Sequence, residues 1–159
     1  MRVGCTGHQG LSPSTRRNVA AAVARLLADR GEGSVVGSSS LAEGADQLFA
    51  FAVLAAGGRL HAVIPSQGYE RTFQSDQARA TYAALLALAD DLTTLAFPEP
   101  SEDAFLAAGH AIADRCDMLI AVWDGQEAAG KGGTGDVVRY ARARGRDVQV
   151  VWPAGARRI

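Results

Sequence analysis

The segment Met118-Leu119-Ile120-Ala121-Val122-Trp123, with the glycine-rich segment Gly130-Lys131-Gly132-Gly133-Thr134-Gly135-Asp136 shortly after it, decides the fold that we predict. The first segment is a continuous apolar run, typical of a strand that is covered by helices on both faces. The second is predicted to be a turn before a helix that runs from Asp136 to about Arg144. Glycines let the backbone approach a ligand closely, and a helix N-terminus attracts anions. We therefore expect this turn to hold a phosphate.

Outward from this segment, β-like runs alternate with helical patterns along the chain. Ser12, Pro13 and Gly31 are typical boundaries of the first helix. The alternation predicts a doubly wound α/β fold of the Rossmann-like type, with a mostly parallel six-stranded sheet and helices on both faces. We expect one domain over residues 1–159. The expected strands are 2–6, 34–37, 60–64, 92–97, 119–123 and 148–152, and the expected helices are 13–30, 41–56, 70–89, 101–115 and 136–144.

The composition is that of an ordinary globular protein. The chain is 48% hydrophobic and has a net charge of -1, which gives no global attraction for nucleic acid or for an anionic membrane. Arginines gather near the C-terminus, and we interpret them as a solvated face, with a binding patch as the alternative. They are Arg139, Arg142, Arg144, Arg146, Arg157 and Arg158.

The two cysteines, Cys5 and Cys116, lie far apart in apolar surroundings and lack the spacing of a metal site. We interpret them as small core residues of a reduced protein. The first residues lead directly into a predicted strand without a signal segment. No apolar run approaches the roughly 20 residues of a membrane span. We therefore expect a cytoplasmic protein without a membrane partner.

Small and polar residues follow four of the predicted strands, at 7–10, 37–40, 65–67 and 124–125. Ligands of such sheets bind at the carboxyl ends of the strands, so we expect these turns and the glycine-rich turn to form one site. The predicted ligand-binding residues are Gly7, His8, Gly37, Ser38, Ser39, Ser40, Glu43, Gly44, Asp46, Asp124, Gly125, Lys131, Gly132, Gly133, Thr134 and Asp136.

Some of these residues also have structural interpretations. Ser40-Leu41-Ala42-Glu43 matches a capping box, in which Glu43 reaches back to the Ser40 backbone. Asp46, further along the same predicted helix, is expected to face a direction similar to that of Glu43. His8 is either a ligand contact or a hydrogen-bonded structural histidine. Trp123 either packs or stacks on a base.

Known cofactor fingerprints are missing from the sequence. Gly4, Gly7 and Gly10 have the spacing G-x-x-G-x-x-G instead of G-x-G-x-x-G, and no acidic residue ends the second predicted strand. Walker, Ser/His/Asp and metal-ligand patterns are also missing. We expect no evident cofactor, and a nucleotide-type ligand whose identity the sequence does not give.

Five segments together carry a resemblance to a known family: Val3–His8, Ser39–Asp46, Ala62–Pro65 with Tyr69, Asp114–Gly125 and Gly132–Asp136. They resemble the SLOG superfamily, which includes the lonely-guy phosphoribohydrolases, the Rossmann domain of DNA-processing protein A and uncharacterised bacterial proteins. The resemblance implies a Rossmann-like fold that binds a nucleotide or a nucleotide-derived ligand, and homo-oligomers are common in such families.

Our leading hypothesis is a sensor or carrier module that is not expected to bind nucleic acid. In it the 130–136 turn holds phosphate and the 38–46 turn contacts ribose or a second phosphate.

The alternative hypothesis is a nucleoside or nucleotide N-glycosidase, in which Glu43 or Asp136 supplies the catalytic carboxylate. The chain departs from the lonely-guy pattern: residues 124–129 intervene between strand and glycines, no proline precedes the glycines, and Ala107-Ala108-Gly109 stands where those enzymes place an essential arginine. A third hypothesis, a DNA-binding accessory domain that uses the C-terminal arginines, conflicts with the near-neutral net charge.

Overall fold

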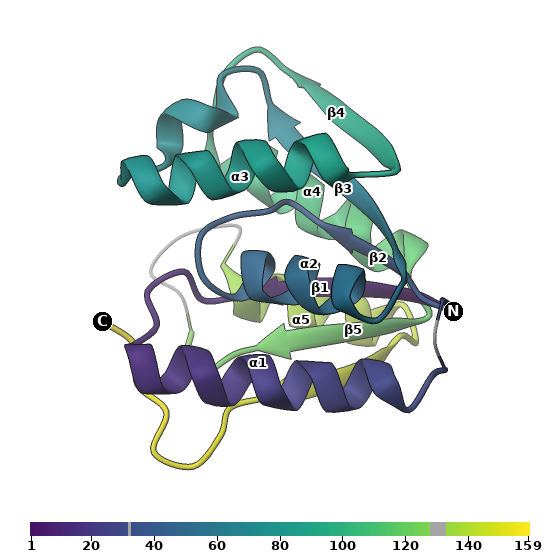
Figure 1. Ribbon diagram of the computed structural model, residues 1–159. Helices are drawn as coiled ribbons and strands as arrows, with labels where there is room; N and C mark the ends of the chain where they lie inside the picture. Colours follow the sequence, from purple (N-terminus) through teal and green to yellow (C-terminus); the bar gives the residue numbers. More distant parts are fainter. Residues whose placement is uncertain (32, 128–132) are drawn as a thin grey trace.

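The computed structural model describes residues 1–31, 33–127 and 133–159 (Figure 1). Its strands form one sheet in the order β4-β3-β2-β1-β5-β6, and every neighbouring pair is parallel. The strands are β1 (Arg2–Gly7), β2 (Val36–Ser39), β3 (Arg59–Ser66), β4 (Asp91–Phe97), β5 (Met118–Val122) and β6 (Asp147–Val151). The helices are α1 (Pro13–Ala28), α2 (Ala45–Ala55), the short 3-10 helix η1 (Tyr69–Thr72), α3 (Asp76–Leu88), α4 (Glu102–Arg115) and α5 (Thr134–Ala143).

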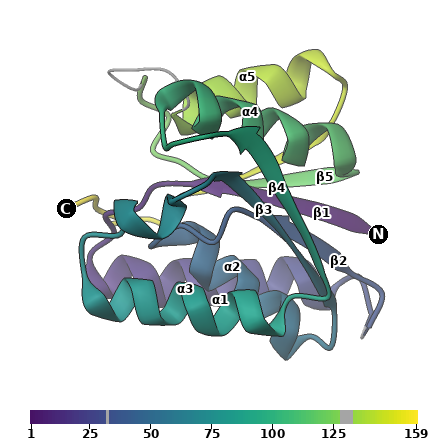
Figure 2. The same ribbon diagram turned by 90° about the horizontal axis from the view of Figure 1, so that it is seen from above.

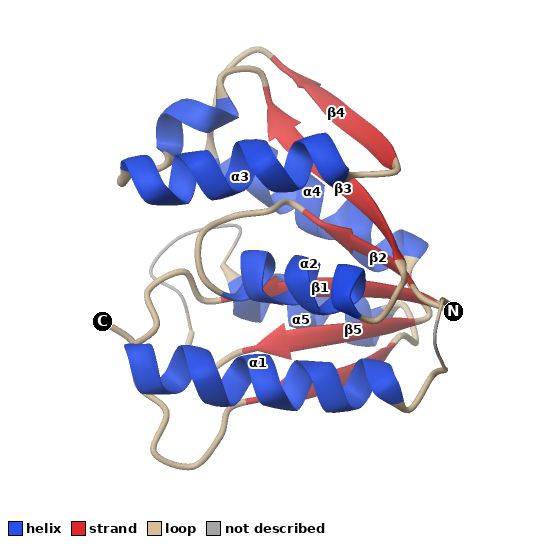
Figure 3. Cartoon of the chain, viewed as in Figure 1, coloured by secondary structure: helices blue, strands red, loops and turns tan. Residues whose placement is uncertain are grey.

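Helices cover both faces of the sheet. Figure 2 shows α1, α2 and α3 on one face and α4 and α5 on the other, and Figure 3 shows the first three in front of the red strands. In β5, Met118 and Ile120 pack in the cluster that includes residues of α1 and α2, whereas Leu119 packs with residues of α4 and α5. Both faces of this strand are buried, which is why its sequence is a continuous apolar run. The predicted doubly wound α/β fold is confirmed.

The sheet has a switch point between β1 and β5. From β1 the chain continues through α1 to β2 on one side, and from β5 it continues through α5 to β6 on the other. Because α1 and α5 cover opposite faces (Figure 2), the two connections leave the carboxyl ends of β1 and β5 in opposite directions. Ligands of open α/β sheets bind in the crevice that such a divergence creates.

Several predicted boundaries are wrong. The second strand spans Val36–Ser39 instead of 34–37, so Ser38 and Ser39 belong to a strand and not to a turn. The segment expected to be one helix over 70–89 is divided into η1 and α3, because Ser75 caps α3 by accepting the Ala78 N–H. The last helix begins at Thr134 and not at Asp136.

The second helix begins at Ala45 and not at Leu41, and the predicted capping box is wrong. Leu41 has a φ of 59° and Gly44 a φ of 89°, so neither residue is helical. Gly44 is the N-cap, and no side chain caps the helix. Leu41 takes this left-handed conformation while its side chain is fully buried, and its N–H donates to Ser39 Oγ at 3.0 Å. Burial of Leu41 and its hydrogen bond to Ser39 thus hold this segment in a turn instead of the expected helix.

The turn before α2 fits tightly onto the loop after β1. The Ala45 N–H donates to the His8 carbonyl at 3.2 Å. A Cβ on Gly44 would lie 2.3 Å from the Gln9 carbonyl oxygen and 2.7 Å from that of His8. A Cβ on Gly7 would likewise lie 2.5 Å from that of Ala45. These contacts fix the start of α2 against the carboxyl end of β1.

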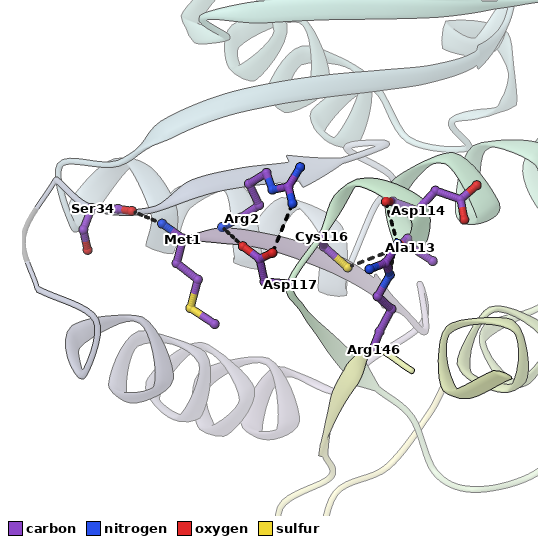
Figure 4. A network of polar contacts seen from close by, with 8 residues as sticks. All are labelled: Met1, Arg2, Ser34, Ala113, Asp114, Cys116, Asp117 and Arg146. Carbon is purple, nitrogen blue, oxygen red and sulfur yellow. Dashed lines mark hydrogen bonds and ion pairs between the residues drawn. The ribbon is translucent and has the colours of Figure 1, made fainter. Parts of the chain in front are cut away.

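Polar contacts tie the amino ends of β1 and β5 at the opposite edge (Figure 4). Asp117 accepts the Arg2 backbone N–H at 2.9 Å and its guanidinium at 3.1 Å, and these contacts lower the pKa of Asp117. Arg146 donates to the carbonyls of Ala113 and Asp114 at 3.0 and 2.9 Å. Arg146 therefore caps the C-terminal end of α4, which differs from the solvated role that we expected for it.

Other expectations can be compared with the same structure. Cys5 and Cys116 are buried and form no disulfide, which confirms that both are core residues. Within residues 1–31, 33–127 and 133–159, no helix combines the length and the apolar character that crossing a membrane requires.

Replacement of Gly44 by alanine tests the fit between α2 and the loop after β1. We expect Gly44→Ala to lower the free energy of unfolding by more than about 2 kcal/mol, because the positive φ is strained for alanine and the new Cβ meets backbone oxygens. Gly145→Ala is the matched control, since Gly145 has a φ of 73° with nothing within 4 Å of its Cβ position. It should cost only about 1 kcal/mol. Urea unfolding of both variants measures the difference, and equal losses would contradict the proposed fit.

Candidate functional site

A cavity of about 480 Å³ lies at the switch point, at the carboxyl ends of β1 and β5. Its volume is within the range of about 300–1,000 Å³ that is usual for small-molecule sites. Its walls come from the turn after β1, the start of α2, the end of β3, η1, α4, the start of α5 and the C-terminal segment. The lining residues are Cys5, Thr6, Gly7, His8, Gln9, Gly10, Ser40, Ala42, Asp46, Pro65, Tyr69, Thr72, Phe105, Gly109, Ile112, Trp123, Gln126, Gly133, Thr134, Gly135, Val137 and Arg158.

The start of α5 forms the wall beside β5. Gly133 is the N-cap, no side chain caps the helix, and the buried Thr134 follows it. The first N–H groups of a helix have no intrahelical acceptor, so this end of α5 presents positive polarity to the cavity. Trp123 lies against it, with a ring atom 3.4 Å from the Cβ position of Gly135. Its Nε1 donates to the Gln126 carbonyl at 3.0 Å. Trp123 thus packs against α5, and because it also lines the cavity, stacking on a base stays a prediction.

His8 lies between two charged side chains. Its Nε2 accepts the Asp124 backbone N–H at 3.1 Å and lies 3.1 Å from Asp124 Oδ1. Burial and the nearby Arg158 lower the pKa of His8, which favours the neutral ring that accepts this N–H. Burial opposes ionisation of Asp124, but the Gln126 N–H and the charge of Arg158 lower its pKa. Arg158 Nη1 is 3.4 Å from Asp124 Oδ2.

Arg158 reaches the cavity because the C-terminal segment folds back over the turn after β1. Leu11 and Arg158 form an antiparallel bridge. The Ile159 N–H donates to the Gly10 carbonyl at 3.1 Å, and the Ser12 N–H donates to the Arg157 carbonyl at 3.2 Å. The sequence showed Arg158 only as one arginine among several. No local pattern indicates that the chain returns to β1, so this residue could not be assigned to the site in advance.

Asp46 is a buried carboxyl group in the cavity wall, with an exposed fraction of 7%. It lies in the first turn of α2, and its Oδ2 accepts the Ala42 N–H at 3.3 Å. Burial raises the pKa of Asp46 to about 7, against the opposing effects of the Ala42 N–H and the Cys5 thiol. Among the residues that the structure describes, no basic side chain forms an ion pair with Asp46. Its carboxyl group is therefore buried without a countercharge.

An aromatic and apolar wall adjoins Asp46. Tyr69 is close enough that the charge of Asp46, after burial, contributes to the raised pKa of its hydroxyl. Tyr69 and Phe105 meet edge to face, with ring centroids 6.2 Å apart and an interplanar angle of 63°. Pro65 and Ile112 line the cavity with them. A flat apolar ring of a ligand can pack against this wall.

Glu43 lies outside the main cavity. It lines a smaller cavity of about 320 Å³, together with Arg16 and Ile159. The two cavities share the lining residues Gln9, Gly10, Ala42, Tyr69 and Thr72. Glu43 precedes α2 and Asp46 lies within it, so the expectation that both carboxylates lie on one helix is wrong.

The structure brings only part of the predicted site together. Six predicted ligand-binding residues line the main cavity: Gly7, His8, Ser40, Asp46, Gly133 and Thr134. Asp124 and Gly44 contact lining residues, through His8 and through the Gln9 and His8 carbonyls respectively. Lys131 and Gly132 lie outside the described residues, as does Gly130. Five further predicted residues are described but do not line the main cavity: Gly37, Ser38, Ser39, Gly125 and Asp136.

Three of the predicted site residues that do not line the main cavity have other contacts. Ser38 Oγ is 3.2 Å from His61 Nδ1 on the neighbouring strand, since β2 extends through Ser38 and Ser39. Ser39 Oγ accepts the Leu41 N–H. The Asp136 carboxylate pairs with Arg139 on the next turn of α5. Within the described part of the chain, no group of three or more histidine, cysteine, aspartate or glutamate side chains is placed to hold a metal ion.

Comparison with known proteins gives the fold but no close relative. Neither a protein-family model nor a curated protein sequence matches the chain. DNA processing protein A (DprA) from Streptococcus pneumoniae superposes with a TM-score of 0.71 at 22% identity, over 97% of this chain and 51% of its own. DprA from Helicobacter pylori, whose structure concerns single-stranded DNA binding, gives 0.68 at 14% identity, over 98% of this chain and 67% of its own.

A molybdenum cofactor binding protein from the phototrophic bacterium Rippkaea orientalis gives a TM-score of 0.57 at 15% identity, over 94% of this chain and 74% of its own. The chain spans about half the length of the DprA from Streptococcus pneumoniae. At these identities the likeness shows the fold alone. That fold is the Rossmann-like one that the resemblance to the SLOG superfamily implies.

The raised pKa of Asp46 predicts an unusual dependence of stability on pH. The folded state holds a proton at Asp46 up to about pH 7, whereas the unfolded carboxyl group loses it near pH 3.8. We therefore expect the free energy of unfolding of the wild type to fall relative to that of Asp46→Asn as the pH rises from about 4 to about 7, by at most about 1.4 kcal/mol per pH unit. Urea unfolding of both proteins across this range measures the difference. A difference that does not change with pH would show that the pKa of Asp46 is normal.

Proposed function

We propose that the protein binds a nucleotide or a nucleotide-derived ligand in the main cavity and acts as a sensor or carrier module. The observation that carries this proposal is the meeting of an uncapped helix N-terminus, an arginine and an aromatic wall around one cavity at the switch point. These groups match the two halves of a nucleotide. A phosphate suits the helix N-terminus and the arginine, and a planar base suits the aromatic wall.

The phosphate would lie at the start of α5. Gly133, Thr134 and Gly135 provide backbone there without a long side chain in the way. Arg158 lines the same cavity and has Asp124 as its partner at 3.4 Å, a separation that is long for a charge-assisted hydrogen bond. A ligand phosphate offers Arg158 closer acceptors than this carboxylate does.

The N-glycosidase alternative has weaker support. A catalytic carboxylate must lie beside the bond that it cleaves. Of the two tentative catalytic residues, Glu43 lines the smaller cavity and Asp136 pairs with Arg139. Asp46 is the buried carboxyl group that does line the main cavity, and its pKa of about 7 suits a general acid. Glycosidases use a pair of carboxyl groups, and neither Glu43 nor Asp136 lines this cavity with Asp46. Ligand binding without hydrolysis is therefore our preferred function.

The C-terminal arginines do not favour a nucleic-acid face. Arg139 pairs with Glu127 and Asp136, and Arg144 pairs with Asp114. Arg146 donates to two helix carbonyls. The carboxylates offset the charges of Arg139 and Arg144, which weakens the attraction of this region for a phosphate backbone. We therefore propose a small ligand and not a nucleic acid. The single domain, a homo-oligomeric state and a cytoplasmic location are further parts of this proposal.

A thermal-stability panel tests the proposal directly. Nucleoside mono-, di- and triphosphates, cyclic nucleotides and nucleoside conjugates are each added, and the shift in Tm is recorded. A ligand at 100 times its Kd stabilises by about 2.7 kcal/mol, or roughly 5–11 °C for a domain of this size. We expect at least one such shift and no release of free base from the compound that gives it. Absence of any shift would contradict the binding function, and release of base would favour the glycosidase.

Substitution of Arg158 tests where the phosphate binds. Arg158→Gln should weaken binding of the active compound by about 10- to 100-fold, because it removes a charged hydrogen-bond donor. Arg157→Gln is the matched control: Arg157 is the neighbouring exposed arginine and does not line the cavity. Isothermal titration calorimetry gives both affinities. Equal weakening by the two substitutions would mean that Arg158 acts only through general charge.

A further inference from the structure

Resting on the proposed function, we infer that Asp46 accepts hydrogen bonds from the heterocycle of the ligand. The donors would be those of the 2-amino-4-oxopyrimidine edge that guanine and pterins share. This inference replaces the sequence-based expectation that the 38–46 turn contacts ribose or a second phosphate. It assigns a direction to the ligand: phosphate at α5 and Arg158, heterocycle at α2 and η1.

The buried carboxyl group of Asp46 disfavours a phosphate beside it. Its carboxyl group is buried, with an exposed fraction of 7%, and no basic side chain of the described residues is paired with it. With a pKa of about 7, Asp46 is partly ionised near neutral pH. An anion beside it would meet this charge with no cation to offset it, whereas hydrogen-bond donors stabilise the ionised form. A group that donates hydrogen bonds is the complementary partner.

The carboxyl group has acceptor positions left for such donors. An ionised carboxylate offers about four lone-pair sites on its two oxygens. The Ala42 N–H takes one at Oδ2, at 3.3 Å, and the nearby Cys5 thiol also opposes the rise in the pKa of Asp46. Two parallel donors of a ligand, such as the ring N–H and exocyclic amine of guanine, fit the remaining positions.

The surroundings of Asp46 favour a heterocycle over a ribose. Tyr69 lines the same cavity as Asp46 and is near enough for the charge of Asp46 to contribute, after burial, to its raised pKa. The Tyr69 and Phe105 rings are 6.2 Å apart. Pro65 and Ile112 extend the same wall. A sugar carries hydroxyl groups around its ring and loses hydration against such a surface, whereas a planar heterocycle buries its faces there and keeps its polar edge for Asp46.

Calorimetry with nucleotides that differ only at the donor edge tests the inference. The compounds are guanosine, inosine, adenosine and xanthosine 5′-monophosphates, with 6-carboxypterin as the second source of the same edge. The wild type should bind guanosine monophosphate more tightly than adenosine monophosphate by about 5- to 150-fold, the range of one bidentate base contact. Inosine monophosphate, which lacks the exocyclic amine, should lie between them.

Asp46→Asn converts one acceptor of the side chain into a donor. The variant should lose its preference for guanosine monophosphate and should bind xanthosine monophosphate more tightly than the wild type does, because xanthine presents an acceptor where guanine has its amine. Asp76→Asn is the control with the same change of charge, since Asp76 is fully exposed on α3, and it should leave all affinities unchanged. Circular dichroism checks that both variants are folded.

The outcomes separate the two proposals. Tight binding of guanosine monophosphate or of 6-carboxypterin, reversed by Asp46→Asn, supports the inference, and the tighter of the two compounds identifies the source of the edge. Equal binding of adenosine and guanosine monophosphates overturns the inference and leaves nucleotide binding intact. Uniform weakening of all nucleotides by Asp46→Asn also overturns it, since a ribose contact would have that effect. Absence of binding by every one of these compounds overturns the inference, and the wider thermal panel decides separately on the proposed function.

Discussion

The tight fit of the turn before α2 on the loop after β1 is the constraint on which the cavity depends. The Gln9 and His8 carbonyls leave no space for a Cβ at Gly44, and the Ala45 N–H bonds to the His8 carbonyl. This contact places His8 and Asp46 on the same cavity although they come from different elements. It also delays the start of α2, which moves Glu43 out of the main cavity and leaves Asp46 as the carboxyl group of its wall.

The cavity is electrically asymmetric as a result. The start of α5 and Arg158 line the cavity, and so do Asp46 and Tyr69. The helices α5 and α2, which carry the first and the third of these groups, lie on opposite faces of the sheet (Figure 2). An anionic group and a hydrogen-bond donor group are therefore favoured at different ends. A ligand that carries both, joined by a length comparable to that of the cavity, satisfies the two ends together. This asymmetry is the physical basis for our preference for a nucleotide-type ligand.

The fold could be predicted from the sequence because it depends on patterns that are local in the chain. The apolar run of β5 indicates a strand buried on both faces, and the alternation of strands with helices indicates a parallel sheet. The start of α2 could not be predicted, because Ser40 and Glu43 match a capping box and only tertiary contacts of Gly44 and Leu41 oppose it. A local preference was overridden by packing.

The same distinction applies to the candidate site. His8, Ser40, Gly133 and Thr134 follow strands or begin a helix, and the sheet brings them together as expected. Arg158 reaches the cavity through a segment without regular structure that returns to the loop after β1. The contribution of Phe105 depends on how α4 crosses the sheet. No sequence pattern around Arg158 or Phe105 indicates a place in the site, so only the three-dimensional arrangement assigns these two residues to it.

The most direct test of the account is a crystal structure with the nucleotide that gives the largest thermal shift. The account predicts the ligand in the main cavity, with phosphate oxygens about 2.7–3.2 Å from the first backbone N–H groups of α5 and from the Arg158 guanidinium. It also predicts the base against Tyr69 and Phe105. A phosphate at Asp46, or a ligand bound elsewhere on the molecule, would contradict it.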